Sequence, residues 1–191
     1  MELILASASP RRRQILSEHG FQFEIITADF EELLFGATPS ATVKVFSLGK
    51  AKAVFDSLPS KRQNTAVVLG ADTVVSFDDK ILGKPANADE ATKMLKMLSG
   101  NTHTVYTGYA IVTKRHTLCE SVATHVTFNS LTDEQIANYV ATGKPLDKAG
   151  AYGIQDGYNL VEKYDGSFLN IVGLPIESFA EKLKTLLTKH N

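Results

Sequence analysis

The sequence predicts an α/β domain built on a mixed central sheet flanked by helices, and two observations support this. Apolar strand-like runs and helical patterns alternate over the first third of the chain, beginning with residues 3–6 and a helix that starts at Pro10. Two long β-rich runs then follow, residues 103–113 and 117–128, joined by a short polar turn that makes them antiparallel partners. The combination indicates parallel and antiparallel pairing in one sheet.

The order of elements in the first part of the chain follows from local signals. The first helix stops at Gly20, because glycine commonly ends a helix. Five segments are then expected in order: a strand over 21–27, an acidic loop over 28–38, a helix over 39–58, a polar loop over 59–64 and a strand over 66–69 that ends at Gly70-Ala71-Asp72-Thr73.

Two later helices carry capping signals. Asn87 with Glu90 resembles a capping box, and Thr132 with Gln135 forms a second one. The remaining expected elements are strand-like fragments around Leu160 and Ile171 and a C-terminal helix opened by Pro175.

Composition limits the classes of function. The 191 residues show no compositional break, so a single domain over residues 1–191 is expected. The net charge of −1, from 20 basic and 21 acidic side chains, does not suggest polymeric nucleic acid or a membrane as partner. A signal-peptide pattern and an apolar run of about 20 residues are both missing from the sequence, and Cys119 is its single cysteine, so we expect a cytoplasmic protein.

The segment after the first strand resembles a phosphate-binding helix start. Ser9 is a good N-cap, and Pro10 occupies the helical position that tolerates proline best. Arg11 and Arg12 then lie in the first turn, where cations oppose the helix dipole. An anion bound by the free N–H groups and the two guanidinium groups would remove that conflict. The alternative is an ordinary surface helix with solvated arginines.

Further charged residues are candidates for chemistry on a phosphate. Asp72 follows a buried strand, where a carboxylate suits metal binding or base catalysis, although a turn aspartate is the alternative. Lys84 lies between a glycine and a proline, Lys52 lies on a predicted helix and Glu32 lies in an acidic loop; each is a solvated side chain in the alternative interpretation. Carboxylates and cations together suit attack on a polyphosphate with a divalent metal such as Mg²⁺.

Four motifs together resemble those of the Maf family of nucleoside triphosphate pyrophosphatases. They are Ser7-Ala8-Ser9-Pro10-Arg11-Arg12, Gly70-Ala71-Asp72-Thr73, Lys84-Pro85 and Asp147-Lys148-Ala149-Gly150-Ala151-Tyr152-Gly153-Ile154-Gln155. The resemblance covers nearly the whole chain. It implies a fold like that of the inosine triphosphate pyrophosphatases, with two lobes around a cleft. It also implies hydrolysis of a nucleoside triphosphate to the monophosphate and pyrophosphate with a divalent cation, Mg²⁺ or Mn²⁺.

Within that family the chain is similar to the branch that acts on dTTP and UTP, and the residues that carry this likeness are Arg12, Thr73 and Gln155. The Gln155 amide offers a donor and an acceptor, which matches the N3–H and O4 edge of uracil and thymine. The family's Asp-Glu pair corresponds here to Asp29-Phe30-Glu31-Glu32. Glu32 is aligned with the family's glutamate, while Glu31 or Asp29 stays an alternative second ligand.

The resemblance implies roles for individual side chains. Ser7, Arg11, Arg12, Lys52 and Lys84 would hold the triphosphate, Glu32 and Asp72 would bind the metal, and Asp72 would activate the attacking water. Thr73 and Gln155 would shape the base pocket. Two alternatives stay open: a pyrophosphatase for 7-methyl-GTP or another purine triphosphate, and a nucleotide-binding regulator of cell division. A homodimer is one candidate assembly.

Overall fold

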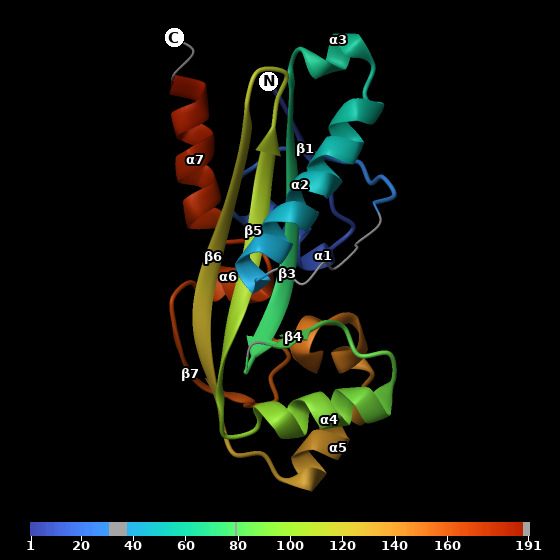
Figure 1. Ribbon diagram of the computed structural model, residues 1–191, viewed down its shortest axis with the longest axis vertical. Helices are drawn as coiled ribbons and strands as arrows, with labels where there is room; N and C mark the ends of the chain where they lie inside the picture. Colours follow the sequence, from blue (N-terminus) through green and yellow to red (C-terminus); the bar gives the residue numbers. More distant parts are fainter. Residues whose placement is uncertain (31–37, 79, 189–191) are drawn as a thin grey trace.

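A mixed sheet runs the length of the molecule (Figure 1). The computed structural model describes residues 1–30, 38–78 and 80–188. The order of its strands is β2-β1-β3-β5-β6-β7, with β4 paired to β3. β1 is parallel to β2 and β3, and every other described pairing is antiparallel, which confirms the predicted mixed sheet. The strands are β1 (Glu2–Leu5), β2 (Glu24–Ile25), β3 (Ala66–Phe77), β4 (Lys80–Leu82), β5 (Thr102–Val112), β6 (Thr117–Phe128) and β7 (Val161–Asp165).

Most helices begin where the capping signals place them. Ser9 caps α1 by accepting from the Arg12 amide, Asn87 caps α4, and Thr132 forms a reciprocal capping box with Gln135 in α5. The helices are α1 (Pro10–Glu18), α2 (Pro39–Ser57), α3 (Ser60–Gln63), α4 (Ala88–Leu98), α5 (Asp133–Ala141), α6 (Phe168–Val172) and α7 (Ile176–Thr188), with two 3₁₀ turns, η1 (Lys144–Asp147) and η2 (Ala149–Ala151). None of the described helices is both long and apolar enough to span a membrane.

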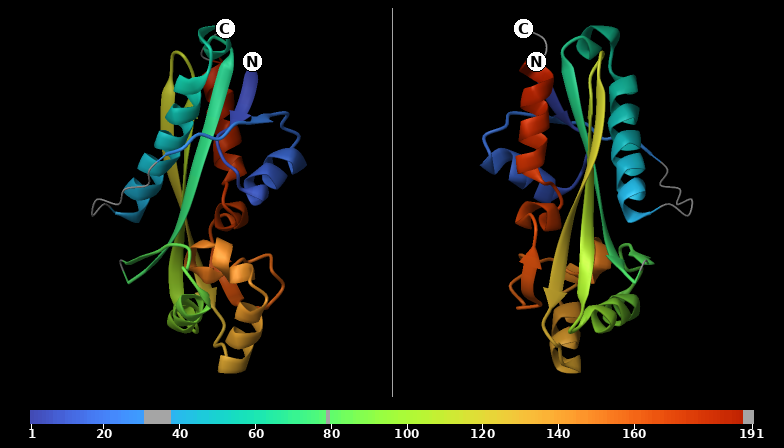
Figure 2. Two further views of the ribbon diagram at one scale, coloured as in Figure 1. Left: turned by 90° about the vertical axis from the view of Figure 1, so that its right-hand side faces the viewer. Right: turned by 60° about the vertical axis from the view of Figure 1, so that its left-hand side comes forward.

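The helices cover the sheet in three groups. α2 packs on one face near the chain termini, and α1, α6 and α7 lie on the opposite face (Figure 2). Beyond them, α4 and α5 gather at the far end of the long strands β3, β5 and β6 (Figure 1). Each group covers its own buried apolar cluster: Val54 lies in the cluster under α2, Phe179 in the one under α1, α6 and α7, and Leu95 in the one under α4 and α5. The long strands therefore connect both ends of the molecule.

Two glycines let α2 lie close to the sheet. A Cβ atom added at Gly70 would lie 2.2 Å from the Ser47 carbonyl oxygen, and one at Gly108 would lie 2.3 Å from the Val43 carbonyl oxygen. Both distances are far below van der Waals contact, so a side chain at either position would push the helix away. This close packing sets the height of α2 above β3, the strand that carries Asp72.

Four local predictions are wrong. Asp72 lies in the middle of β3 rather than after its end, because β3 keeps pairing with β5 as far as Ser76. The segment around Ile171 is helical, because Ser167 caps α6 by accepting from the Asn170 amide. The polar stretch 59–64 contains the short helix α3, and the strand predicted over 21–27 is reduced to Glu24–Ile25.

Candidate active site

A cavity of about 440 Å³ opens beside the middle of β3. Pairing with β1 ends at Leu69 and pairing with β4 begins at Val75, so the described strands leave residues 70–74 paired on one side only, with β5. The start of α1, the Gly83-Lys84 loop and the segment 147–156 surround this stretch. The topology therefore brings three of the four sequence motifs to the part of β3 that pairs on one side only, and this part carries the remaining motif.

The Arg12 side chain connects α1 to β3 and α6. Its Nε donates to the Gly173 carbonyl at 2.9 Å, Nη1 donates to Ser7 Oγ at 3.0 Å, and Nη2 donates to Thr73 Oγ1 at 3.1 Å. Three different acceptors thus fix the plane of the guanidinium group. Arg12 and Thr73, both expected to set specificity, are in direct contact. Ser7 is buried under Arg12 and is not among the residues that line the cavity.

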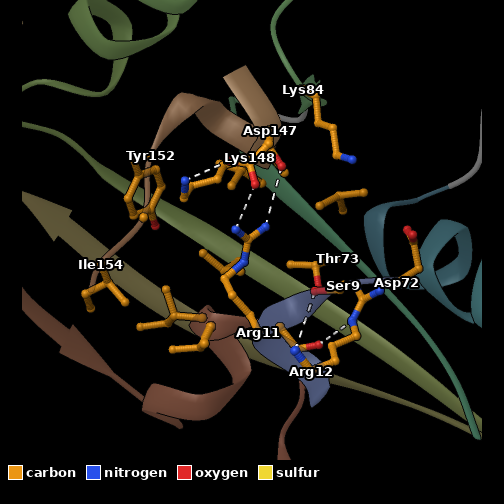
Figure 3. Close-up of a pocket in the computed structure, with 18 of the residues that line it drawn as sticks. Ser9, Arg11, Arg12, Asp72, Thr73, Lys84, Asp147, Lys148, Tyr152 and Ile154 are labelled. Carbon is orange, nitrogen blue, oxygen red and sulfur yellow. Dashed lines mark hydrogen bonds and ion pairs between the residues drawn. The ribbon is translucent and has the colours of Figure 1, made fainter. Parts of the chain in front are cut away.

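Arg11 points across the cavity (Figure 3). Its Nη1 lies 3.1 Å from Asp147 Oδ2, and its Nη2 donates to the Asp147 carbonyl at 3.5 Å. Partial burial alone would raise the pKa of Asp147, but hydrogen bonds from Lys148 and Arg11 hold that pKa below its ordinary value. Arg11 therefore links α1 to the fourth motif, a contact that no local sequence signal indicates.

Asp72 faces α2 and forms an ion pair with Lys50. The carboxylate is buried, and its Oδ1 lies 2.6 Å from Lys50 Nζ. The sequence-based choice of Lys52 is not supported by this geometry, because Lys52 is exposed and is not among the cavity-lining residues. Helical spacing could have found Lys50: it follows buried Ser47 by three residues and precedes buried Val54 by four, so it lies on the same helix face.

Lys84 lines the cavity from the loop after β4, and its side chain lies on the Asp72 side of the site (Figure 3). The neighbouring Gly83 carbonyl accepts from the Gly150 amide at 3.0 Å. Gly150 has a φ of 68° and packs against Val75, so this position needs glycine on both conformational and steric grounds. The Lys84 loop and the fourth motif are thus connected through their backbones.

Gln155 lies in a turn that Tyr139 holds in place. The Asp156 amide donates to the Gly153 carbonyl at 3.1 Å, which closes the turn around Gln155. The Tyr139 hydroxyl accepts from the Gly153 amide at 3.0 Å and donates to Asp156 Oδ2 at 2.5 Å. Gln155 itself is exposed at the rim of the cavity, where its amide is available to a ligand.

A buried histidine supports the wall of the cavity next to this turn. His103 Nε2 lies 2.7 Å from the Tyr152 hydroxyl, and both rings pack edge-on against Phe128. Burial lowers the pKa of His103 to about 4, so the ring is neutral at physiological pH. Tyr152 lines the cavity on the same side as Ile154 (Figure 3). The sequence analysis did not identify His103, because a histidine within a strand run gives no local signal.

The residues described here fit one particular mode of metal binding. Within residues 1–30, 38–78 and 80–188, no group of three or more His, Cys, Asp and Glu side chains could hold a metal by itself. Mg²⁺ is often held by one or two carboxylates together with substrate phosphates and waters. Asp72, which lines the cavity, suits that mode. Glu32 and Glu31 lie outside the described residues, while Asp29 is described and exposed.

Comparison with known proteins gives the family. Residues 2–186 match the family model described as Maf-like protein. A dTTP/UTP pyrophosphatase of Bacillus cereus (strain B4264) is 45% identical over 185 residues, which cover 96% of this chain and 94% of the relative. One from Desulfitobacterium hafniense (strain Y51) is 48% identical over 185 residues, covering 95% of this chain and 83% of the relative. The motifs that meet at β3 and these full-length matches agree, and the chain belongs to the Maf family.

Proposed function

We propose that this protein is a pyrophosphatase that hydrolyses dTTP and UTP to the nucleoside monophosphate and pyrophosphate. The observation that carries the proposal is the division of the cavity by β3. Asp72 and Thr73 are neighbours on a strand, so their side chains lie on opposite faces of the sheet. The Asp72 face then offers charged side chains for the triphosphate, and the Thr73 face offers an apolar wall for the nucleobase.

The Asp72 face suits the triphosphate. Lys50 contributes a cation from α2, and Lys84 lies on the same side of the cavity. Arg11 lines the same cavity from the start of α1, on the opposite face of the sheet (Figure 2), where backbone N–H groups also favour an anion. Together these cations would neutralise the charge that develops on the leaving pyrophosphate.

The Thr73 face suits the nucleobase. Val75 and Val105 are register partners on this face, and Tyr152, Ile154 and Val172 line the cavity beside them. Apolar side chains of this kind bury the flat faces of a pyrimidine, while the Gln155 amide at the rim supplies a donor and an acceptor for its edge.

Asp72 is the proposed general base. Its carboxylate would take the proton from the water that attacks the α-phosphorus, and the bond to the β-phosphate would then break. Lys50 holds this carboxylate in one orientation through their ion pair. A divalent cation held by Asp72 and the proposed ligand Glu32 would polarise the phosphate oxygens.

We also propose that residues 1–191 form one domain of the inosine triphosphate pyrophosphatase type, with two lobes around this cavity. The three apolar clusters on a continuous sheet support it. Limited proteolysis tests this proposal. A stable folded fragment much shorter than the whole chain would show a second, separable domain and would contradict the proposal.

The decisive experiment is product analysis. The purified protein is incubated with UTP, dTTP, CTP and 7-methyl-GTP, each with Mg²⁺ or Mn²⁺, and the products are separated by chromatography. We expect UMP and dTMP with pyrophosphate, and little turnover of the other two nucleotides. UDP with orthophosphate as the main products, or a preference for 7-methyl-GTP, would refute the proposal.

A further inference from the structure

Behind Thr73 lies a chain of buried hydrogen bonds that ends on a backbone carbonyl. Thr107 is the register partner of Thr73 on β5, is fully buried, and has its Oγ1 2.9 Å from Thr73 Oγ1. On its other side, Thr107 Oγ1 lies 2.9 Å from the carbonyl oxygen of Asn170 in α6. That carbonyl belongs to the last turn of a short helix, where carbonyl groups have acceptor capacity to spare.

The carbonyl fixes the direction of every proton in this chain. A carbonyl oxygen only accepts, so the single hydroxyl proton of Thr107 is donated to Asn170. Thr107 then has no proton left for Thr73, and the contact of 2.9 Å requires Thr73 to be the donor. The proton of Thr73 is committed to Thr107, while its oxygen accepts from Arg12 Nη2. Among the described contacts, one lone pair of Thr73 Oγ1 is then left to accept.

We propose that Thr107 is a positioning residue that makes Thr73 a hydrogen-bond acceptor toward the cavity, and that Thr73 accepts the N3–H of uracil or thymine. The inference rests on the proposed function and deepens it. Uracil and thymine carry a proton on N3, whereas cytosine presents a bare lone pair at the same position. Cytosine would therefore place an acceptor against an acceptor, which leaves both groups unpaired in a buried site.

In this assignment, Thr73 and Gln155 contact different atoms of the base. When Thr73 accepts from N3–H, the NH₂ group of the Gln155 amide donates to O4. Thr73 is half-buried and held from two sides, by Arg12 and by Thr107, while Gln155 is exposed on a turn. Thr73, whose geometry is the more fixed, thus contacts N3, which carries a proton in uracil and a lone pair in cytosine.

The test uses a pair of substitutions that differ by one hydroxyl group. Thr107→Val has nearly the same shape as threonine but gives Thr73 its proton back, so Thr73 can donate to N3 of cytosine. Thr107→Ser keeps the hydroxyl and loses a methyl group. We expect the ratio of kcat/KM for UTP to that for CTP to fall at least about tenfold in Thr107→Val and to stay within about twofold of wild type in Thr107→Ser.

Binding of the products, UMP and CMP, is measured in parallel by calorimetry, so that the result does not depend on turnover. Thr73→Val, at a half-buried position, carries the same test if Thr107→Val does not fold, and we expect the same loss of discrimination. An equal decrease for UTP and CTP in Thr107→Val, or the same ratio in the Val and Ser variants, would overturn the proposal. Failure of the wild-type protein to hydrolyse UTP would instead refute the proposed function.

Discussion

Lys50 Nζ lies 2.6 Å from Asp72 Oδ1, and this ion pair joins the longest helix to the strand at the centre of the site. It exists because Gly70 and Gly108 let α2 approach the sheet closely. A lysine two positions further along the same helix points elsewhere, so the chain itself supplies a matched control.

Lys50→Met should reduce kcat/KM for UTP by about 10–100-fold, because a charge-assisted contact to a carboxylate contributes about 1.5–3 kcal/mol. Lys52→Met removes the same charge from an exposed position and should stay within about twofold of wild type. Steady-state kinetics on both variants makes the comparison. A larger effect at Lys52 than at Lys50 would show that the sequence-based choice was right.

Asp72→Asn should reduce kcat by about 10²–10⁴-fold while the protein stays folded, because it removes the basic oxygen with almost no change in shape. Asp56→Asn on the exposed side of α2 is the control for the loss of one negative charge. Turnover is measured at saturating metal, and folding is checked by circular dichroism. Retention of more than half of the wild-type kcat would exclude Asp72 as the base.

Gln155→Glu should lower kcat/KM for UTP and dTTP and narrow their advantage over CTP. A carboxylate has no donor for O4, whereas it can accept from the amino group of cytosine. The three substrates are compared side by side in wild type and variant. An unchanged UTP-to-CTP ratio would mean that Gln155 does not contact the base.

His103 should make stability depend on pH below neutrality. Burial lowers the pKa of its ring to about 4 from an ordinary 6.5, so the unfolded chain binds more protons than the folded one between these values. Stability therefore rises with pH across this window and is lost as the pH falls through it.

His103→Gln keeps a polar partner for Tyr152 but does not titrate. Between pH 7 and pH 5, the free energy of unfolding should fall by up to about 2 kcal/mol less in this variant than in wild type. Urea unfolding at the two pH values provides the measurement. Equal losses in both proteins would mean that the ring already binds its proton in the folded state.

Local sequence signals predicted part of this structure well. Ser9 and Pro10 fixed the start of α1, and Thr132 with Gln135 fixed that of α5, because capping depends on residues three positions apart. The partners within the site were not predictable in this way. Arg11 meets Asp147 from 136 residues away, and such a contact depends on topology that no short window contains.

Two further differences from the sequence-based expectations have other physical causes. Lys50, and not the expected Lys52, lines the cavity, because a shift of two residues along a helix places a side chain on the opposite face. Ile171 gave a strand-like signal because an apolar residue in a five-residue helix shows too little periodicity to be distinguished.

The adjacency of Asp72 and Thr73 on β3 has a consequence for how this site can change. One peptide unit separates the proposed base from the residue proposed to contact the nucleobase, so the spacing between them is set by covalent geometry. Motions of helices or loops leave that spacing unaltered. A slip of β3 by a single residue, by contrast, would exchange the two sides of the sheet and abolish cleavage and selectivity together. We therefore expect substrate preference to change by substitution at fixed positions of this strand, and not by insertion or deletion within it.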